Sequence, residues 1–225
     1  MGSKLTSSHY GDIDRAEMLR FIPAHARRVL DVGCHTGGFG RAVKQQFNAE
    51  VWGVEPHAQA ARVSGEHLDR VFNCLFSEDV PIDDHYFDAI VFNDVLEHMA
   101  DPWAALRLAA RKLRPEGLVI VSIPNLRHID NLVHLMRDRD FQYEPAGIRD
   151  KTHLRFFTRK SAPRIFDDTG LSVVHIEGVN EACFQSPARR IAYFLFRRYL
   201  DDTRHINYAM VAKRSDCLAN IHSTN

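Results

Sequence analysis

A short acidic turn that contains a histidine is the part of the sequence best equipped for proton chemistry. Asp94, Glu97 and His98 stand at positions i, i+3 and i+4, so a helical turn would place their side chains on one face. A neutral imidazole suits proton removal near pH 7 because its ordinary pKa lies close to that value. A structural role competes with this one: Glu97 and His98 would then cap the loop and bond to neighbouring backbone. Two roles also remain open for His153: it could contact the substrate, or it could be a buried, hydrogen-bonded histidine with a structural role.

A glycine-rich loop after the first expected strand indicates a second kind of chemistry, the binding of a nucleoside-containing ligand. The segment that starts at Asp31 reads DVGCHTGGFG. Gly33 and Gly37 let the backbone turn sharply and approach a ligand, and the helix that follows presents free N–H groups. Glu55 ends the next expected strand, where a carboxylate can accept two hydrogen bonds from a ribose diol.

Two classes of ligand satisfy this arrangement. A nicotinamide dinucleotide requires the spacing G-x-G-x-x-G with its pyrophosphate on the helix, but His35 stands where the second glycine would be. An adenosyl group joined to an amino acid needs no phosphate site. His35 is compatible with such a loop, because histidine adopts a positive φ more readily than most residues.

The ordered motifs of the chain resemble those of class I S-adenosylmethionine-dependent methyltransferases. They read VLDVGCHTGG, GVE, FDAI, DVLEH and LRPEG, and they follow one another in that order. The resemblance covers about residues 10–180. It implies a Rossmann-like, doubly wound α/β fold of three layers, with a seven-stranded, mostly parallel sheet whose last strand is antiparallel.

The resemblance also implies a cofactor, S-adenosyl-L-methionine, and residues that would bind it. The loop from Asp31 to Gly37 would hold the methionine part, Glu55 the ribose hydroxyls, and Asn93 and Asp94 the sulfonium end. The complete set of expected cofactor-binding residues is Asp31, Gly33, His35, Gly37, Glu55, Asn93 and Asp94. The family often has an aspartate after the third strand for the adenine amino group, and this chain has none there. That departure and His35 support a further alternative, a non-catalytic cofactor-binding module.

In a methyltransferase the turn after the fourth strand lies where the acceptor binds. Transfer to a hydroxyl needs an in-line nucleophile and removal of its proton, and the candidate catalytic residues are Glu97, His98 and His153. Related branches, including ubiquinone-pathway and small-RNA 2′-O-methyltransferases, look similar at this turn and use such residues for a divalent metal. A metal here would draw its ligands from Asp94, Glu97, His98 and His153. The metal is the less favoured alternative, and the structural, general-base and metal roles stay open.

Short β-rich runs alternate with helical periodicity, which predicts a parallel sheet covered on both faces. Strands are expected at 29–32, 51–54, 70–76, 89–92, 118–123, 171–177 and 207–212, and helices at 38–47, after the Asp101-Pro102 cap and at 161–169. The helix after Pro102 is expected to turn Trp103 inward. Two insertions, about 125–158 and 178–204, interrupt the alternation, and insertions at strand ends in such sheets usually build the ligand pocket.

Length and composition limit the number of domains, the classes of partner and the cellular location. The 225 residues predict one domain, 1–225, with an N-terminal lid at 1–27 in which Tyr10 and Arg15 would fold over the cofactor. The 29 Lys+Arg balance 29 Asp+Glu, which argues against a nucleic-acid partner. The 4 cysteines lack disulfide or C-x-x-C spacing, and no apolar run approaches the ~18 residues that span a bilayer. We therefore expect a soluble cytoplasmic protein.

Two further segments bear on the acceptor and on partners. SIPN at 122–125 and DKTHLRFFT at 150–158 look like segments of methyltransferases that modify bacterial surface polysaccharides and sugars. They favour a sugar or polysaccharide hydroxyl as the acceptor, with a quinone, phenol or amine as the alternative. Pro187–Leu200 interleaves apolar side chains with arginines, a pattern that suits an anionic membrane surface, the chain's own core, or a second subunit in a homodimer.

Overall fold

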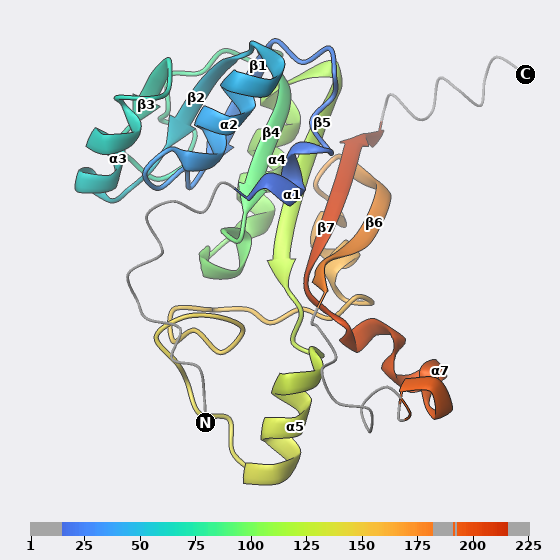
Figure 1. Cartoon of the computed structure of the whole chain (residues 1–225). Coiled ribbons are helices and arrows are strands. Elements are labelled where there is room, and N and C mark those ends of the chain that lie inside the picture. Colours follow the sequence, from blue (N-terminus) through green and yellow to red (C-terminus); the bar gives the residue numbers. More distant parts are fainter. Residues whose placement is uncertain (1–14, 182–190, 192, 216–225) are drawn as a thin grey trace, which may run out of the picture.

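The structure is a computed structural model that describes residues 15–181, 191 and 193–215. Its centre is a seven-stranded sheet in the order β3-β2-β1-β4-β5-β7-β6 (Figure 1). The strands are β1 (Arg28–Val32), β2 (Glu50–Val54), β3 (Arg70–Phe72), β4 (Phe87–Asn93), β5 (Leu113–Pro124), β6 (Leu171–Glu181) and β7 (His205–Arg214). Strands β1 to β5 pair in parallel, and β7 runs antiparallel to both of its neighbours. The expected Rossmann-like sheet with an antiparallel last strand is confirmed.

Helices lie on both faces of the sheet (Figure 1). The α-helices are α1 (Ala16–Leu19), α2 (Gly38–Phe47), α3 (Ala58–Ser64), α4 (Pro102–Lys112), α5 (Ile129–Asp138) and α7 (Arg197–Leu200). Within the described residues, the short 3-10 helices are η1 (Leu96–His98), η2 (Ala162–Phe166) and η3 (Asp201–Thr203). η1 is the acidic turn after the fourth strand of the sequence. Glu97 and His98 lie in this helical turn, but Asp94 stands outside it with a φ of 55°, so the prediction that one helical face holds all three is wrong.

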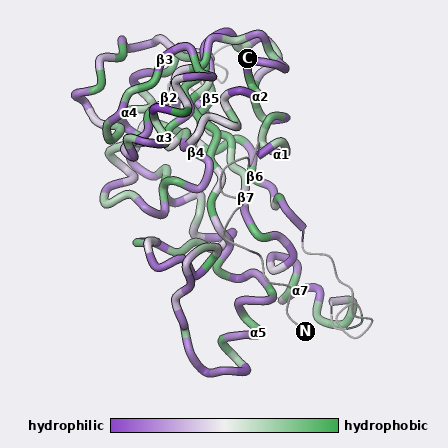
Figure 2. Tube along the Cα trace, turned by 60° about the vertical axis from the view of Figure 1, so that its left-hand side comes forward, coloured by the Kyte–Doolittle hydropathy of each residue, from purple (hydrophilic) through white to green (hydrophobic). Residues whose placement is uncertain are grey.

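The central strands are apolar throughout because both of their faces are covered. On β1, Leu30 packs in one cluster with Leu106 of α4, while Val29 packs in another with Val43 of α2. Alternate side chains of a strand point to opposite faces, so one apolar run supplies both halves of the core. Figure 2 shows the apolar residues gathered along these interior strands.

Helix α4 begins at the predicted cap. Asp101 Oδ1 accepts a hydrogen bond from the Ala104 amide at 2.9 Å, and Pro102 takes a first-turn position that needs no N–H. Leu106 is fully buried, but Trp103 is 36% exposed, so the prediction that Trp103 faces inward is wrong. Its ring lies instead beside the Arg155 guanidinium, 5.0 Å from the ring centroid, on the outside of the helix.

Other boundaries also differ from the predicted ones; β5, for example, begins at Leu113 rather than at 118. β3 stops at Phe72 because the next residue, Asn73, turns its side-chain amide to the carbonyls of Glu55 and Pro56 at 2.8 and 3.0 Å. The segment 161–169 forms only η2, and Asp168 follows with a φ of 59° that no helix continues. β6 pairs with β7 as far as Glu181, so the second insertion begins after residue 181 rather than at 178.

The first insertion returns to the sheet through a bridge between Asn125 and Phe157 and contains α5, which projects beyond the end of β5 (Figure 1). Of the predicted N-terminal lid, residues 1–14, with Tyr10, lie outside the described part. Cys34 and Cys74 are free thiols, and Cys183 and Cys217 lie outside the described residues. Cytoplasmic localisation stays a prediction.

The described part of the basic, apolar segment is strongly exposed. Phe194 is 84% and Tyr199 69% exposed, and neither Arg197 nor Arg198 pairs with an acid of the described chain. Residues 187–190 and 192 lie outside the described part. Among the residues that the structure describes, none of the helices combines the length and the apolar character needed to cross a membrane. Contact with a membrane surface or with a second subunit stays a prediction.

Candidate active site

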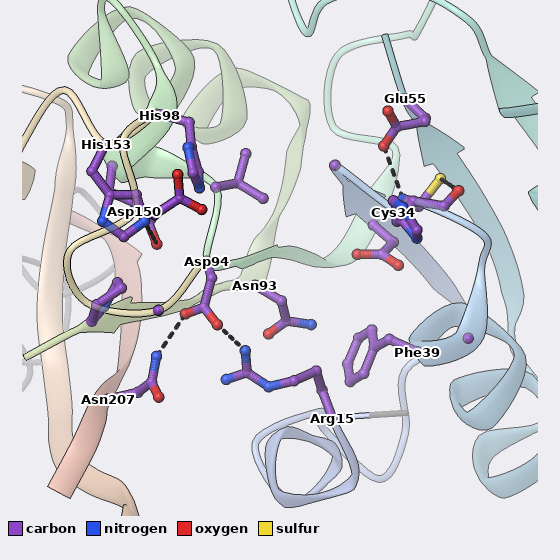
Figure 3. A pocket seen from close by; sticks show the side chains of 18 of the residues that line it. Arg15, Cys34, Phe39, Glu55, Asn93, Asp94, His98, Asp150, His153 and Asn207 are labelled. Atoms are coloured by element: carbon purple, nitrogen blue, oxygen red, sulfur yellow. Dashed lines mark hydrogen bonds and ion pairs between the residues drawn. The ribbon is translucent and has the colours of Figure 1, made fainter. Parts of the chain in front are cut away.

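A cavity of about 370 Å³ opens at the carboxyl ends of the central strands. The order β2-β1-β4 places the ends of these three strands side by side, which is where ligands bind in open α/β sheets. Of the residues singled out in the sequence, those that line the cavity are Asp31, Gly33, His35, Glu55, Asn93, Asp94, Glu97, His98 and His153. Figure 3 shows Glu55 at one end and the two histidines at the other. Gly37 is not part of this lining.

The glycine loop has the backbone that its sequence predicts. Gly33 has a φ of 73°, and a Cβ there would lie 2.6 Å from a Val95 methyl carbon, so no other residue fits without movement. His35 has a φ of 47°, in agreement with the expectation that histidine tolerates this position. Gly37 has a φ of 83° and packs against Ser64, where a Cβ would lie 3.1 Å from the Ser64 Cα. Gly37 therefore allows α2 to begin close to α3.

The Glu55 carboxylate is fixed by two backbone amides. Oε2 accepts from the His35 amide at 2.9 Å, and Oε1 from the His57 amide at 2.8 Å. A carboxylate oxygen has a second lone pair, so both oxygens can still accept from hydroxyls in the cavity. This geometry suits a ribose diol.

Asp31 and Asn93 bring polar atoms into the cavity that find no hydrogen-bond partner in the described chain. These atoms are Asp31 Oδ2 and both amide atoms of Asn93, and all three are buried. Burial, and after it the charge of Glu55, raises the pKa of Asp31 to about 7. Buried polar groups are nearly always hydrogen-bonded in folded proteins, so these atoms indicate a polar ligand.

Asp94 is held by three residues from distant parts of the chain. Its Oδ1 accepts from Ser122 Oγ at 2.7 Å and from Asn207 Nδ2 at 2.9 Å, and its Oδ2 pairs with Arg15 (Figure 3). Arg15 belongs to the predicted lid and does reach the cavity. Ser122 and Asn207 were missed, because they stand on β5 and β7 and only the pairing of these strands brings them to Asp94.

Glu97 is an isolated buried acid. It is 1% exposed, and neither carboxyl oxygen has a hydrogen-bond partner among the described residues. Burial, and after it the negative charge of Asp94, raises the pKa of Glu97 well above its usual range. The Glu97 carboxyl therefore does not cap the loop, although its main-chain carbonyl accepts from the Leu154 amide at 2.8 Å.

The two histidines meet at this acid. The ring centroids of His98 and His153 lie 4.6 Å apart, and His153 Nε2 lies 4.0 Å from Glu97 Oε1. Burial and the neighbouring His98 lower the pKa of His153, which favours its neutral form. One ligand atom from each of Glu97, His98 and His153 lies within 4.8 Å of the others. Asp94, the fourth predicted metal ligand, is bound by Arg15, Ser122 and Asn207 instead.

The sequence pattern of the family described as "Methyltransferase domain" matches residues 12–176 of the chain. The chain belongs to this family. It is an S-adenosylmethionine-dependent methyltransferase, as its ordered motifs led us to expect. The cavity fits that cofactor, because its fixed Glu55 carboxylate and the unpartnered atoms of Asp31 and Asn93 supply acceptors and donors for a polar adenosyl amino acid.

Known methyltransferases resemble the chain in sequence and in structure. A "Ubiquinone biosynthesis O-methyltransferase" of Neisseria meningitidis is 27% identical over 174 residues, 72% of each chain. The protein of the same name from Chromobacterium violaceum is 26% identical over 211 residues, 88% of this methyltransferase and 84% of the relative. The solved SAM-dependent methyltransferase of Archaeoglobus fulgidus superposes with a TM-score of 0.68 at 21% identity, covering 89% and 92% of the two chains.

Proposed function

We propose that this methyltransferase transfers the methyl group to a hydroxyl of a small molecule of the phenol class. The observation that carries the proposal is the trio of Glu97, His98 and His153 beside Asp94 in the cofactor cavity. Such proton acceptors suit a hydroxyl whose proton must leave as the new carbon–oxygen bond forms. The relatives named ubiquinone biosynthesis O-methyltransferases support the same chemistry. They favour this acceptor over the sugar or polysaccharide hydroxyl that the sequence segments suggested.

The cofactor would lie along the cavity from Glu55 to Asp94. Glu55 accepts hydrogen bonds from the ribose hydroxyls, and Asp31 and Asn93 bind the polar groups of the methionine part. Asp94, held by Arg15, places its negative charge beside the sulfonium. The trio would then lie on the methyl side of the sulfonium, where an acceptor oxygen could attack the methyl carbon in line with the departing sulfur.

The trio has two alternative functions in this proposal, because an imidazole nitrogen that binds a cation has no lone pair left for a proton. Without a cation, His98 or His153 accepts the proton of the acceptor hydroxyl, and His153 is kept neutral for this by its burial. The same three side chains can hold a divalent cation, because they offer a carboxylate and two imidazoles within 4.8 Å. A bound cation would stabilise the developing negative charge on the acceptor oxygen.

A panel of acceptors tests the proposal. The enzyme is incubated with methyl-labelled S-adenosylmethionine and, separately, a catechol, an aromatic amine and a neutral saccharide. We expect label on a catechol oxygen and equimolar S-adenosylhomocysteine. Label on the saccharide alone, or on the amine alone, would contradict the proposal. Cofactor binding without transfer to any of the three would favour a non-catalytic module.

A further inference from the structure

A chain of hydrogen bonds runs from Asp150 through Thr152 to His98. Thr152 Oγ1 lies 2.7 Å from Asp150 Oδ1 and 3.0 Å from His98 Nδ1. Asp150 Oδ1 also accepts from the Thr152 amide at 2.8 Å, which fixes the hydroxyl relative to the carboxylate. The main-chain carbonyl of Thr152 lies 3.3 Å from the same His98 nitrogen. Two oxygens of one residue therefore face one ring nitrogen.

The directions of these bonds follow from the chemistry of the groups. An ionised carboxylate only accepts, and a charge-assisted bond is stronger than one to a neutral ring, so the single Thr152 hydroxyl proton goes to Asp150. The hydroxyl lone pairs then face His98 Nδ1. The Thr152 carbonyl can also only accept. Nδ1 of His98 therefore has to carry the proton, and Nε2 of His98 keeps its lone pair.

A main-chain carbonyl of the same loop also fixes the tautomer of the second histidine. His153 Nδ1 lies 3.2 Å from the carbonyl oxygen of Ile148, which again can only accept. Nε2 of His153 is then the unprotonated nitrogen, and it is this atom that lies 4.0 Å from Glu97 Oε1. Hydrogen bonds from residues 148–153 thus leave the Nε2 lone pair of both His98 and His153 free.

We propose that Thr152, anchored by Asp150, is a positioning residue that holds His98 in its Nδ1–H form and so makes Nε2 the nitrogen that faces the reaction. The hydrogen bond on one ring nitrogen decides which nitrogen stays free, and partners of this kind orient the histidines of catalytic and metal sites. The effect on catalysis rests on the proposed function, whereas the assignment of the His98 tautomer is independent of it.

Thr152→Val tests the proposal, because valine keeps the branched shape and removes the hydroxyl. The tautomer is read from the ring nitrogens of His98 by 15N NMR on the full-length, metal-free protein, with the signals assigned from a His98→Gln variant. We expect Nδ1–H in the wild-type protein and in Thr152→Ser, and a substantial gain of the Nε2–H form in Thr152→Val. Lys151→Ala, an exposed neighbour, is the matched control and should match the wild-type protein.

Turnover provides the second measurement. With a methylated acceptor in hand, Thr152→Val should lower kcat by roughly 10- to 100-fold, and Thr152→Ser should restore it. The affinity for S-adenosylhomocysteine should stay unchanged in both variants. A wild-type His98 with its proton on Nε2 overturns the tautomer assignment. A Thr152→Val spectrum identical to wild type overturns the role of the hydroxyl, because the Thr152 carbonyl alone would then hold the tautomer. A shifted tautomer with unchanged kcat overturns the positioning role, and failure to find any acceptor counts against the proposed function alone.

Discussion

Buried carboxyls at the cavity tie the stability of the cofactor-free protein to pH. Asp31 has its pKa raised to about 7 by burial and by Glu55, from an ordinary value of 3.8. Between these two values the folded protein binds a proton that the unfolded chain has released. Stability therefore falls as pH rises through this window, by on the order of 4 kcal/mol from this group.

Asp31→Asn should flatten that slope. We expect thermal unfolding of the cofactor-free variant to depend less on pH between about 4 and 7 than that of the wild-type protein. Asp88 provides a control of opposite sign: burial opposes its ionisation, but the amides of Arg27 and Arg28 and the side chain of Arg114 lower its pKa. The wild-type protein therefore gains stability from Asp88 as pH rises toward the ordinary aspartate value of 3.8, and Asp88→Asn should lose that gain while keeping the wild-type slope between about 4 and 7. An unchanged slope in Asp31→Asn would show that Asp31 does not carry the effect.

The trio predicts a response to metal that needs no assay of activity. A divalent cation such as Mn²⁺ should raise the melting temperature of the chelator-treated protein, by the equivalent of about 2.7 kcal/mol at 100 times its Kd. Glu97→Gln should abolish the shift, because it removes the only anionic ligand of the three. His134→Ala, a histidine on α5 bonded to Asp138, is the control. An equal shift in Glu97→Gln would place the cation elsewhere.

At the scale of elements, Arg15, the residue that precedes α1, brings its side chain to one side of the cavity. Arg15 joins its guanidinium to Asp94 and donates to Ser122 Oγ at 3.0 Å. Arg15→Ala should weaken S-adenosylhomocysteine binding by roughly 10-fold, because Asp94 loses a charged hydrogen bond that fixes it. Calorimetric titration measures this change.

Arg20, which follows α1 at its other end, is the matched control. It pairs with Glu177 and is 55% exposed, so Arg20→Ala should leave the affinity unchanged. Equal losses in the two variants would mean that both act by loosening α1, not through Asp94.

The turn from β1 into α2 offers a second test. Gly33→Ala places a methyl group 2.6 Å from Val95 and holds alanine at a positive φ. We expect about 1–3 kcal/mol of lost stability from the backbone strain, together with weaker cofactor binding. Adding Val95→Ala should recover the part due to overlap and leave the part due to φ. Full recovery would show that the overlap alone makes glycine necessary.

Across the whole molecule, sequence patterns predicted what is local and missed what depends on pairing between distant segments. The apolar runs predicted the central strands, and the glycine loop and Glu55 fell at the carboxyl ends where they were expected. Arg15, Ser122 and Asn207 converge on Asp94 only because β5 pairs with β7 and α1 packs beside them. Neither the SIPN segment that contains Ser122 nor the strand that contains Asn207 indicates a contact with Asp94, so only the sheet order reveals these contacts.

The errors at element ends have the same origin. A side chain that bonds outside its own element, as Asn73 does to the carbonyl of Glu55, ends a strand that its apolar pattern would continue. Trp103 faces outward, where its ring contacts Arg155 of the first insertion, a residue 52 positions further along the chain. The trio likewise forms only because the loop 148–153 lies against η1, where the Leu154 amide donates a hydrogen bond to the Glu97 carbonyl. The sequence alone does not indicate this contact.

The central claim is that this methyltransferase uses His153, beside Glu97 and His98, to methylate a small-molecule hydroxyl. The most direct measurement compares wild-type and His153→Ala proteins for S-adenosylhomocysteine formation at saturating cofactor and catechol, together with their affinity for S-adenosylhomocysteine. We predict a loss of roughly 100-fold or more in kcat with the affinity unchanged. Equal turnover by the two proteins would contradict the account.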